Sequence, residues 1–346
     1  MSKSDAIRRR DRRQLVRVPT ISLRDLTNAE LPEALARRSW TMLNDEAYFL
    51  LTDVGAAFPH VDAAWDAIQR YFAQPPTVKL AGHIAHSVDH HGYVPMGEEG
   101  KTGDEADYKE SFDCGWYPPT GPAEKLEGHW PDVAGFSKSI TLVRHQMRDV
   151  AERVARLLSR MLGEDEDYLS RRAQNPPSQL RLLHYPGDDP TRVGVDWHTD
   201  YECFTLLMTT RPGLEVRRVN GTVVRVPFHP DSLVVTLGDL MEVMTNGGLR
   251  ASDHGVYPLE EERYSIAYFY ALDWSSHVRP LPRFVGPSGY HYPEVVAGEH
   301  LLRRTDDGFG YRRASRTQSG ESSVELSGPM SPYFYVRESA DTDNVQ

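Results

Sequence analysis

Apolar residues recur at three- and four-residue spacing in two stretches of the chain, which predicts two amphipathic helices. The first covers 60–73 and the second covers 137–162, where Gly163 follows as a helix-ending residue. The longer helix carries one apolar stripe, formed by Val143, Met147, Val150, Val154, Leu157 and Met161. We expect this stripe to pack against a sheet. Two further helices are predicted, from Pro32 to about Asn44 and from Glu294 to Arg303.

Short strand-like runs separated by turn residues replace this pattern between Gln179 and Ala271. The runs are Leu180–Tyr185, Phe204–Thr209, Leu214–Val219, Thr222–Val226, Leu233–Leu237 and Tyr264–Leu272. Asn220-Gly221 predicts a two-residue hairpin turn in which both residues take positive φ. Many short strands at this spacing predict a mainly β protein with flanking helices (α+β), whose core is a double-stranded β-helix, or jelly roll, backed by the long helix.

The chain divides into four parts by this pattern. We expect a flexible basic tail over 1–17 and an N-terminal region over 18–135, which begins strand–helix–strand and, from residue 76, has few periodic cues and is expected to be loop with short strands. The jelly-roll core with its backing helix follows over 136–305. A partly disordered C-terminal extension covers 306–346.

Composition and charge limit the classes of partner. The chain has 346 residues and a net charge of −11, so it is a poor candidate for nucleic-acid binding. No apolar run approaches the length of a membrane span. The two cysteines cannot form a disulfide framework, and the Arg-rich start is not followed by an apolar stretch. We therefore expect a cytoplasmic protein, a monomer or weak homodimer, whose partner is a small molecule.

His198 and Asp200, joined by the distant His254, are the most informative polar residues. Side chains at i and i+2 of a strand share a face, and a barrel can bring His254 to that face. Two imidazoles and one carboxylate can hold one face of iron(II) and leave the other open for oxygen. An isolated His-x-Asp pair is weak evidence in a chain with 14 histidines. The interpretation of this pair as metal ligands is better supported because the block 238–247 precedes His254 and Arg263-x-Ser265 follows it.

This order of motifs resembles the iron(II)/2-oxoglutarate-dependent dioxygenases of the isopenicillin N synthase-like family. The similarity extends from about residue 18 to about 305. It also includes the segments Val18–Leu23, Tyr48–Thr52, Gly92–Pro95, Asp107–Phe112, Leu180-Arg181 and Tyr185-Pro186. The chain departs from the common family pattern at Leu183, Ala251 and Gly255, and none of these is a metal ligand.

The resemblance implies an oxygenase with iron(II), 2-oxoglutarate and O2 as cofactor and co-substrates. Iron would be held by His198, Asp200 and His254, with no catalytic residue beyond these ligands, and the oxoacid by Arg263, Ser265 and Tyr185. The enzyme would hydroxylate, desaturate or cyclise a small molecule, such as a natural-product intermediate or modified amino acid, with release of succinate and CO2. By analogy, the substrate would contact His91, Tyr93, Phe112, Tyr201, Phe204 and Tyr270.

Several alternatives stay open from the sequence. Some relatives keep the Arg-x-Ser pair without consuming 2-oxoglutarate, and a non-catalytic barrel that binds a small acid belongs to another class. Zinc hydrolases also use His and Asp ligands. Arg263 could instead form an exposed ion pair with one of Glu260, Glu261 and Glu262. The histidines over 83–91 could form a second metal site, although a loop at the pocket mouth is the simpler interpretation.

Overall fold

A computed structural model describes residues 18–87, 90–100, 106–115, 130–310 and 312 of the chain. Two sheets form a jelly roll within this part. The larger sheet has the strand order β1-β2-β10-β7-β12-β5-β4-β3, and the smaller sheet has the order β6-β11-β8-β9. The strands of the larger sheet are β1 (Thr20–Ser22), β2 (Tyr48–Thr52), β3 (Gly92–Val94), β4 (Glu110–Cys114), β5 (Leu180–Tyr185), β7 (Phe204–Thr209), β10 (Ser232–Leu237) and β12 (Arg263–Tyr270). The smaller sheet contains β6 (Val195–His198), β8 (Leu214–Arg217), β9 (Val223–Arg225) and β11 (Asp253–Val256).

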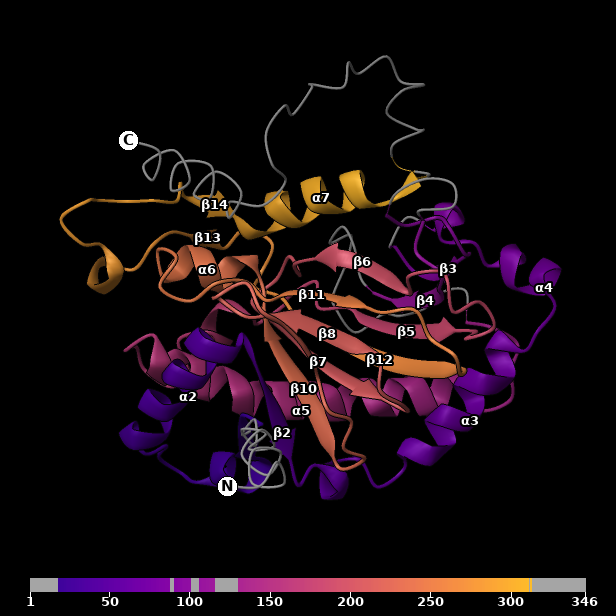
Figure 1. The fold of residues 1–346 in the computed structure, drawn as a ribbon, viewed down its shortest axis with the longest axis horizontal. Helices are drawn as coiled ribbons and strands as arrows, with labels where there is room; N and C mark the ends of the chain where they lie inside the picture. The colour runs from indigo at the N-terminus through magenta and orange to yellow at the C-terminus, as the bar shows by residue number, and fades with distance from the viewer. Residues whose placement is uncertain (1–17, 88–89, 101–105, 116–129, 311, 313–346) are drawn as a thin grey trace, which may run out of the picture.

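Helices cover the outer face of the larger sheet, and a further helix lies on the opposite side of the molecule (Figure 1). The helices are α2 (Glu33–Glu46), α3 (Val61–Phe72), α4 (Pro76–Ala81), α5 (Phe136–Met161), α6 (Asp239–Met244) and α7 (Ala297–Gly308), and β13 (His277–Val278) pairs with β14 (Val295–Val296) before α7. All six residues of the predicted apolar stripe on α5 are buried. They join one large hydrophobic core between the sheet and α2, α3 and α5. The predicted jelly roll with a backing helix is confirmed.

The N-terminal region contributes strands to both ends of the larger sheet. β2 pairs with β10, and β4 pairs with β5, so strands from both sides of the predicted boundary at 135 share one sheet. At the other end, α7 continues through the predicted boundary at 305. The tail over 1–17 and most of the extension over 306–346 lie outside the described residues.

Two local predictions need correction. Residues 76–81, expected to be loop, form α4, which Pro76 begins at its first turn. In the hairpin between β8 and β9, Gly221 has φ +82° but Asn220 does not have positive φ. Gly221 N donates to Arg218 O and Arg218 N donates to Thr222 O. The connection is thus a three-residue loop with a left-handed glycine, rather than a two-residue turn.

Candidate active site

His198, Asp200 and His254 meet at the mouth of the jelly roll. One ligand atom from each lies within 4.8 Å of the others, and they are the one group of this kind among the described residues. His198 ends β6 and pairs in register with His254 on β11. The Nε2 atoms of the two histidines lie 3.8 and 3.9 Å from Asp200 Oδ1. The His198 side chain is 38% exposed, whereas those of Asp200 and His254 are buried, so the site is open on one side.

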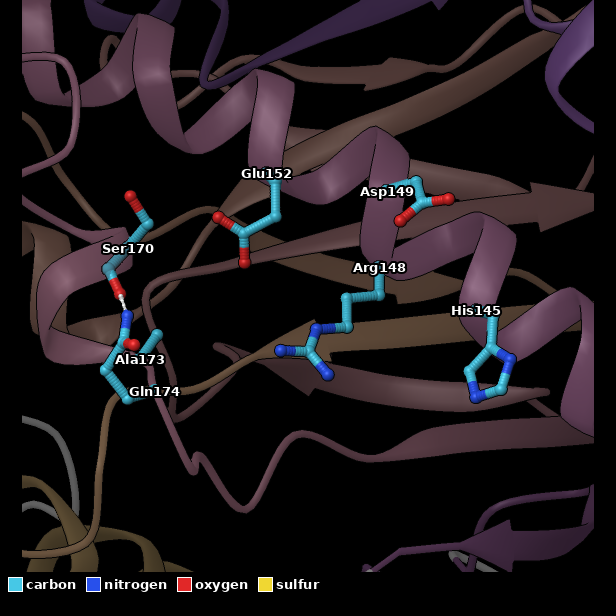
Figure 2. A pocket seen from close by; sticks show the side chains of 7 residues that line it. All are labelled: His145, Arg148, Asp149, Glu152, Ser170, Ala173 and Gln174. Carbon is cyan, nitrogen blue, oxygen red and sulfur yellow. Dashed lines mark hydrogen bonds between the residues drawn. The ribbon is translucent and has the colours of Figure 1, made fainter. Parts of the chain in front are cut away.

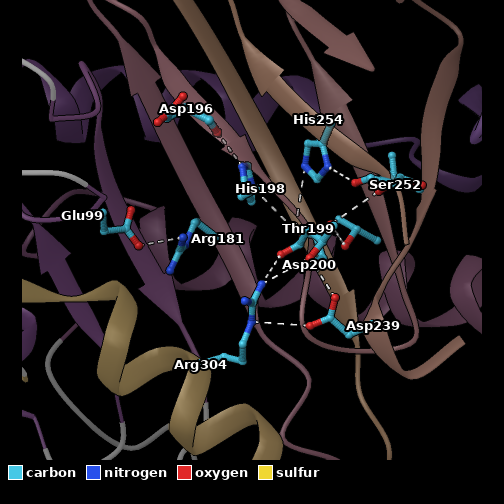
Figure 3. Close-up of polar contacts among 12 residues, drawn as sticks. Glu99, Arg181, Asp196, His198, Thr199, Asp200, Asp239, Ser252, His254 and Arg304 are labelled. Carbon is cyan, nitrogen blue, oxygen red and sulfur yellow. Dashed lines mark hydrogen bonds and ion pairs between the residues drawn. The ribbon is translucent and has the colours of Figure 1, made fainter. Parts of the chain in front are cut away.

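The surrounding backbone orients both imidazoles. His198 Nδ1 lies 2.9 Å from Asp196 O, and His254 Nδ1 lies 2.9 Å from Ser252 O (Figure 3). A carbonyl can only accept, so each Nδ1 carries the proton and each Nε2 lone pair points toward the shared centre. Partial burial, and then the neighbouring His254, lower the pKa of His198 below its ordinary value. The neutral imidazole that binds a metal is therefore the stable form at neutral pH.

Asp200 is held by hydroxyl groups from the floor of the barrel. Thr205 Oγ1 donates to Asp200 Oδ2 at 2.5 Å, and Thr236 Oγ1 lies 3.4 Å from the same oxygen. Oδ1 remains directed toward the two histidines. The donor set, its spacing and its outer contacts fit a divalent metal such as iron(II).

Replacing Thr205 by Val should weaken metal binding while leaving the three ligands in place. Loss of an outer contact to a ligand typically reduces metal affinity by about 10- to 100-fold, and we expect the lower end because Thr236 remains. Titration of the apo-protein with iron(II) under anaerobic conditions measures this. Thr205→Ser should restore most of the affinity, and the exposed Thr191→Val serves as the control. An unchanged affinity in Thr205→Val would contradict the assigned role.

Arg263 and Ser265 form a polar cradle inside the barrel. Arg263 is 1% exposed and Ser265 is fully buried. Arg263 Nη1 and Nη2 and Ser265 Oγ make no hydrogen bond of good geometry, although Tyr185 interacts with both side chains and Arg263 Nε donates to Arg211 O. The Tyr185 ring lies 4.8 Å from the Arg263 guanidinium carbon. A buried guanidinium fork and hydroxyl without partners are suited to a carboxylate, which fits the oxoacid.

No acidic side chain of this protein's described residues satisfies Arg263. Glu261 pairs with Arg211, and Glu262 pairs with His184. Burial lowers the pKa of Arg263 and raises that of Tyr185. Gly213 (φ +157°) makes room for the guanidinium, since a Cβ there would lie 2.9 Å from Arg263 Nε. The alternative of an exposed ion pair at Arg263 is therefore wrong.

A group of buried charges, which the sequence reasoning missed, lies beside the metal ligands. We call Glu99, Lys109, Asp113 and Arg181 the charged cluster. Arg181 donates to both oxygens of Asp113 at 2.7 and 2.8 Å and lies 2.9 Å from Glu99 Oε1, while Lys109 contacts Glu99 Oε2. Lys109 of this cluster acts electrostatically on the ligand His198, and Figure 3 shows the Arg181–Glu99 ion pair in the same view as His198 and Asp200. One signal was available in the sequence: Arg181 is a charged residue in an apolar strand, on the same face as Tyr185.

α7 is fastened to the loop that carries Asp200. Asp239 accepts from Thr199 Oγ1 at 2.8 Å and lies 3.0 Å from His300 Nε2 and 3.4 Å from Arg304 Nε. Arg304 Nη2 donates to Thr199 O at 3.1 Å, and Asp239 N donates to Asp200 O at 2.9 Å. We call these contacts the α7 latch (Figure 3). The Thr199 side chain, which lies between the two ligands in the sequence, contacts Asp239 and Arg304 of α7.

Five of the six residues expected at the substrate lie on the wrong face of the larger sheet. His91 packs edge-on against Phe112 and Trp130, and Tyr93 donates to Glu110. Phe204 and Tyr270 stack at 4.7 Å in the core that contacts α5. Because side chains alternate along a strand, it is Thr205 rather than Phe204 that faces the metal. We withdraw His91, Tyr93, Phe112, Phe204 and Tyr270 as substrate contacts; Tyr201, whose ring lies 4.6 Å from Arg304, stays a prediction.

Phe204→Ala tests this correction. A fully buried phenylalanine replaced by alanine should lower the free energy of unfolding by about 3–5 kcal/mol. Urea denaturation of this variant and of Phe228→Ala, whose side chain is exposed, measures the effect. If Phe204→Ala keeps its stability and alters only the KM of a substrate, the original assignment was right.

The histidines over 83–91 do not form a second metal centre among the described residues. His83 Nδ1 accepts from Ala85 N, and His90 lies 3.4 Å from Asp113 in the neighbourhood of the charged cluster. A groove of about 430 Å³ on the polar side of α5 is lined by charged and amide side chains (Figure 2). It lies on the helix face opposite the buried stripe, so the sheet separates it from the metal ligands.

Comparisons with known proteins agree with this site. The family model described as the 2OG-Fe(II) oxygenase superfamily matches residues 176–272, and the model described as the non-haem dioxygenase in morphine synthesis N-terminal matches 18–133. The chain is 27% identical to the 2-oxoglutarate-dependent dioxygenase tropC of Talaromyces stipitatus, over 83% of this chain and 94% of that one. It is 24% identical to a homoarginine-6-hydroxylase of Arabidopsis thaliana, over 77% and 86%. The structure of a 2OG-Fe(II) oxygenase family protein of Caulobacter crescentus superposes with a TM-score of 0.72 at 25% identity, over 84% and 99%.

Proposed function

This chain belongs to the iron(II)/2-oxoglutarate-dependent dioxygenases, and from that premise we propose that it oxidises a C–H bond of a polar small molecule. Hydroxylation is the outcome we favour, and a natural-product intermediate or modified amino acid is the substrate class. The observation that supports a polar substrate is the charged cluster, whose Lys109 acts electrostatically on the ligand His198. The two cysteines are free and buried, which suits a cytoplasmic enzyme. No described helix has the length and apolar character needed to cross a membrane.

Two groups of residues would bind the metal and the oxoacid. His198, Asp200 and His254 would hold iron(II), and Arg263 with Ser265 would bind the far carboxylate of 2-oxoglutarate. When bound, iron and the oxoacid supply the oxidising chemistry, with succinate and CO2 as products. The protein orients the ligands through Asp196 O, Ser252 O and Thr205, and Arg304 of α7 binds the loop that carries Asp200. Restricting water and fixing the substrate's position limits unproductive oxidation.

Three functional alternatives stayed open from the sequence, a zinc hydrolase among them, and none is retained. Family, relatives and structural neighbours all indicate 2-oxoglutarate-dependent oxygenases, rather than a non-catalytic barrel or an oxidase without the oxoacid. The departure at Leu183 leaves the cradle intact, because Leu183 pairs with Ser265 in register and adds only an apolar wall.

A screen for substrate-stimulated succinate release tests the proposal. The purified enzyme, iron(II) and 2-oxoglutarate are incubated with polar natural-product intermediates and amino-acid derivatives, and product mass distinguishes +16 for hydroxylation from −2 for desaturation or ring closure. Stimulation only by neutral, fully apolar compounds would contradict the substrate class.

A further inference from the structure

The charged cluster contains a carboxylate held between two cations. Glu99 presents Oε1 to Arg181 at 2.9 Å and Oε2 to Lys109. Both cations are largely buried, with side-chain exposures of 16% and 4%. Arg181 is fixed independently of Glu99, because its Nε and Nη2 already donate to Asp113. The position of the Glu99 carboxylate is therefore a preformed anion site, lined by one guanidinium and one ammonium.

We propose that Arg181 and Lys109 bind a carboxylate of the substrate, and that Glu99 occupies this position until the substrate displaces it. This inference rests on the proposed function and names its substrate class: a carboxylic acid with an apolar body. The Phe269 and Phe309 rings lie 5.9 and 5.6 Å from the Arg181 guanidinium carbon and would contact such a body.

The site is distinct from the oxoacid cradle. Arg181 and Tyr185 share one face of β5 but stand four residues apart, which corresponds to roughly 13 Å at about 3.3 Å per residue. Tyr185 pairs in register with Arg263, whereas Arg181 pairs with Ala267 at the other end of the strand, and Lys109 of the same cluster acts electrostatically on His198. A carboxylate at Arg181 would thus place the rest of a small molecule next to the metal without competing with 2-oxoglutarate.

Electrostatics and backbone both favour exchange of the anion. Burial, and then the Arg181 guanidinium, lower the pKa of Lys109 to about 7, so an anion bound between the two side chains would favour the charged form of Lys109. Although burial alone would raise it, Arg181 holds the pKa of Asp113 below its ordinary value, so Asp113 stays a fixed counter-charge. Glu99 stands between Gly97 and Gly100, which have φ values of +77° and +75°. Its segment is joined to the end of α7, where Gly100 N donates to Gly308 O.

Binding of three small probes tests the proposal. Benzoate, benzamide and benzylamine have the same ring with a negative, neutral or positive group. Each is titrated calorimetrically under anaerobic conditions into protein loaded with iron(II) and saturating 2-oxoglutarate, which blocks the Arg263 cradle. We expect benzoate to bind more tightly than benzamide, and Glu99→Gln to strengthen benzoate binding by about tenfold, because a competing charge is removed. Lys109→Met should abolish the preference for benzoate.

Glu261→Gln, an exposed glutamate in an ion pair, is the matched control and should leave all three affinities unchanged. Equal affinities for benzoate and benzamide, or no gain in Glu99→Gln, would overturn the inference. Benzylamine binding that disappears in Glu99→Gln would also overturn it, since Glu99 itself would then be the recognition group. Titration of 2-oxoglutarate on the same samples separates the two proposals: if the oxoacid binds and benzoate does not, only the carboxylate site is wrong.

Discussion

His198→Ala is expected to abolish both iron binding and turnover. Two ligands remain in this variant, and a site with two protein ligands cannot hold a divalent metal against water as three can. The loss of iron affinity should exceed the roughly 10- to 100-fold loss that removal of an outer contact to a ligand causes. Anaerobic addition of iron(II) and 2-oxoglutarate to the wild-type protein should produce a visible metal-to-ligand charge-transfer absorption, and this absorption should be absent from the variant.

His60→Ala is the matched control, because His60 is exposed and makes no side-chain capping contact with α3. It should keep the absorption and the rate of succinate release. The thermal unfolding midpoint of metal-free His198→Ala should stay close to that of the wild type, since the His198 side chain is partly exposed. Full activity of His198→Ala would contradict the assignment of His198 as a metal ligand.

Arg263→Met should weaken 2-oxoglutarate binding by at least about 100-fold. Each charge-assisted hydrogen bond contributes about 1.5–3 kcal/mol, and the two unpartnered amino groups of the guanidinium would be lost together. The free energy of unfolding without 2-oxoglutarate should not decrease, because the substitution removes a buried charge that has no acidic partner. The charge-transfer absorption, titrated with the oxoacid, measures the affinity.

Arg211→Met controls for loss of positive charge near the cradle. The Arg211 side chain is half exposed and pairs with Glu261, and only its backbone oxygen contacts Arg263. It should leave oxoacid affinity unchanged. Saturating 2-oxoglutarate should also raise the unfolding midpoint of the wild type and of Arg211→Met, but not of Arg263→Met. Comparable oxoacid affinity in the two variants would show that the guanidinium at 263 is not the clamp.

The strands could be predicted because the alternation of apolar residues is a local pattern. The metal ligands could be predicted because their motifs follow one another in a recognisable order along the chain. β5 and β7 have the predicted limits, since alternating apolar residues end at turn residues on both sides. His198 and Asp200 needed only the period of a strand, and His254 needed a sheet that brings β11 beside β6. Arg263 could be assigned from its place after His254, and the structure adds the reason, which is a buried fork without a partner.

The substrate contacts could not be predicted because they depend on which face of each strand is inside. Phe204 and Thr205 are adjacent in the sequence, yet one contacts the core and the other contacts Asp200. Aromatic residues suggested a pocket, but the larger sheet buries them under α5. The charged cluster draws Glu99, Lys109, Asp113 and Arg181 from three separate segments, and only the pairing of β4 with β5 brings Asp113 opposite Arg181. No local pattern records that pairing.

The α7 latch ties two equilibria together. Thr199 precedes the ligand Asp200 and also accepts a hydrogen bond from Arg304 of α7. Metal binding and docking of α7 therefore involve the same segment of backbone. The two effects are thermodynamically linked. If docking of α7 raises the affinity for iron by a given factor, binding of iron raises the equilibrium constant for docking of α7 by the same factor. A substitution that loosens α7 from this loop is therefore expected to weaken iron binding by the same factor by which loss of iron loosens α7.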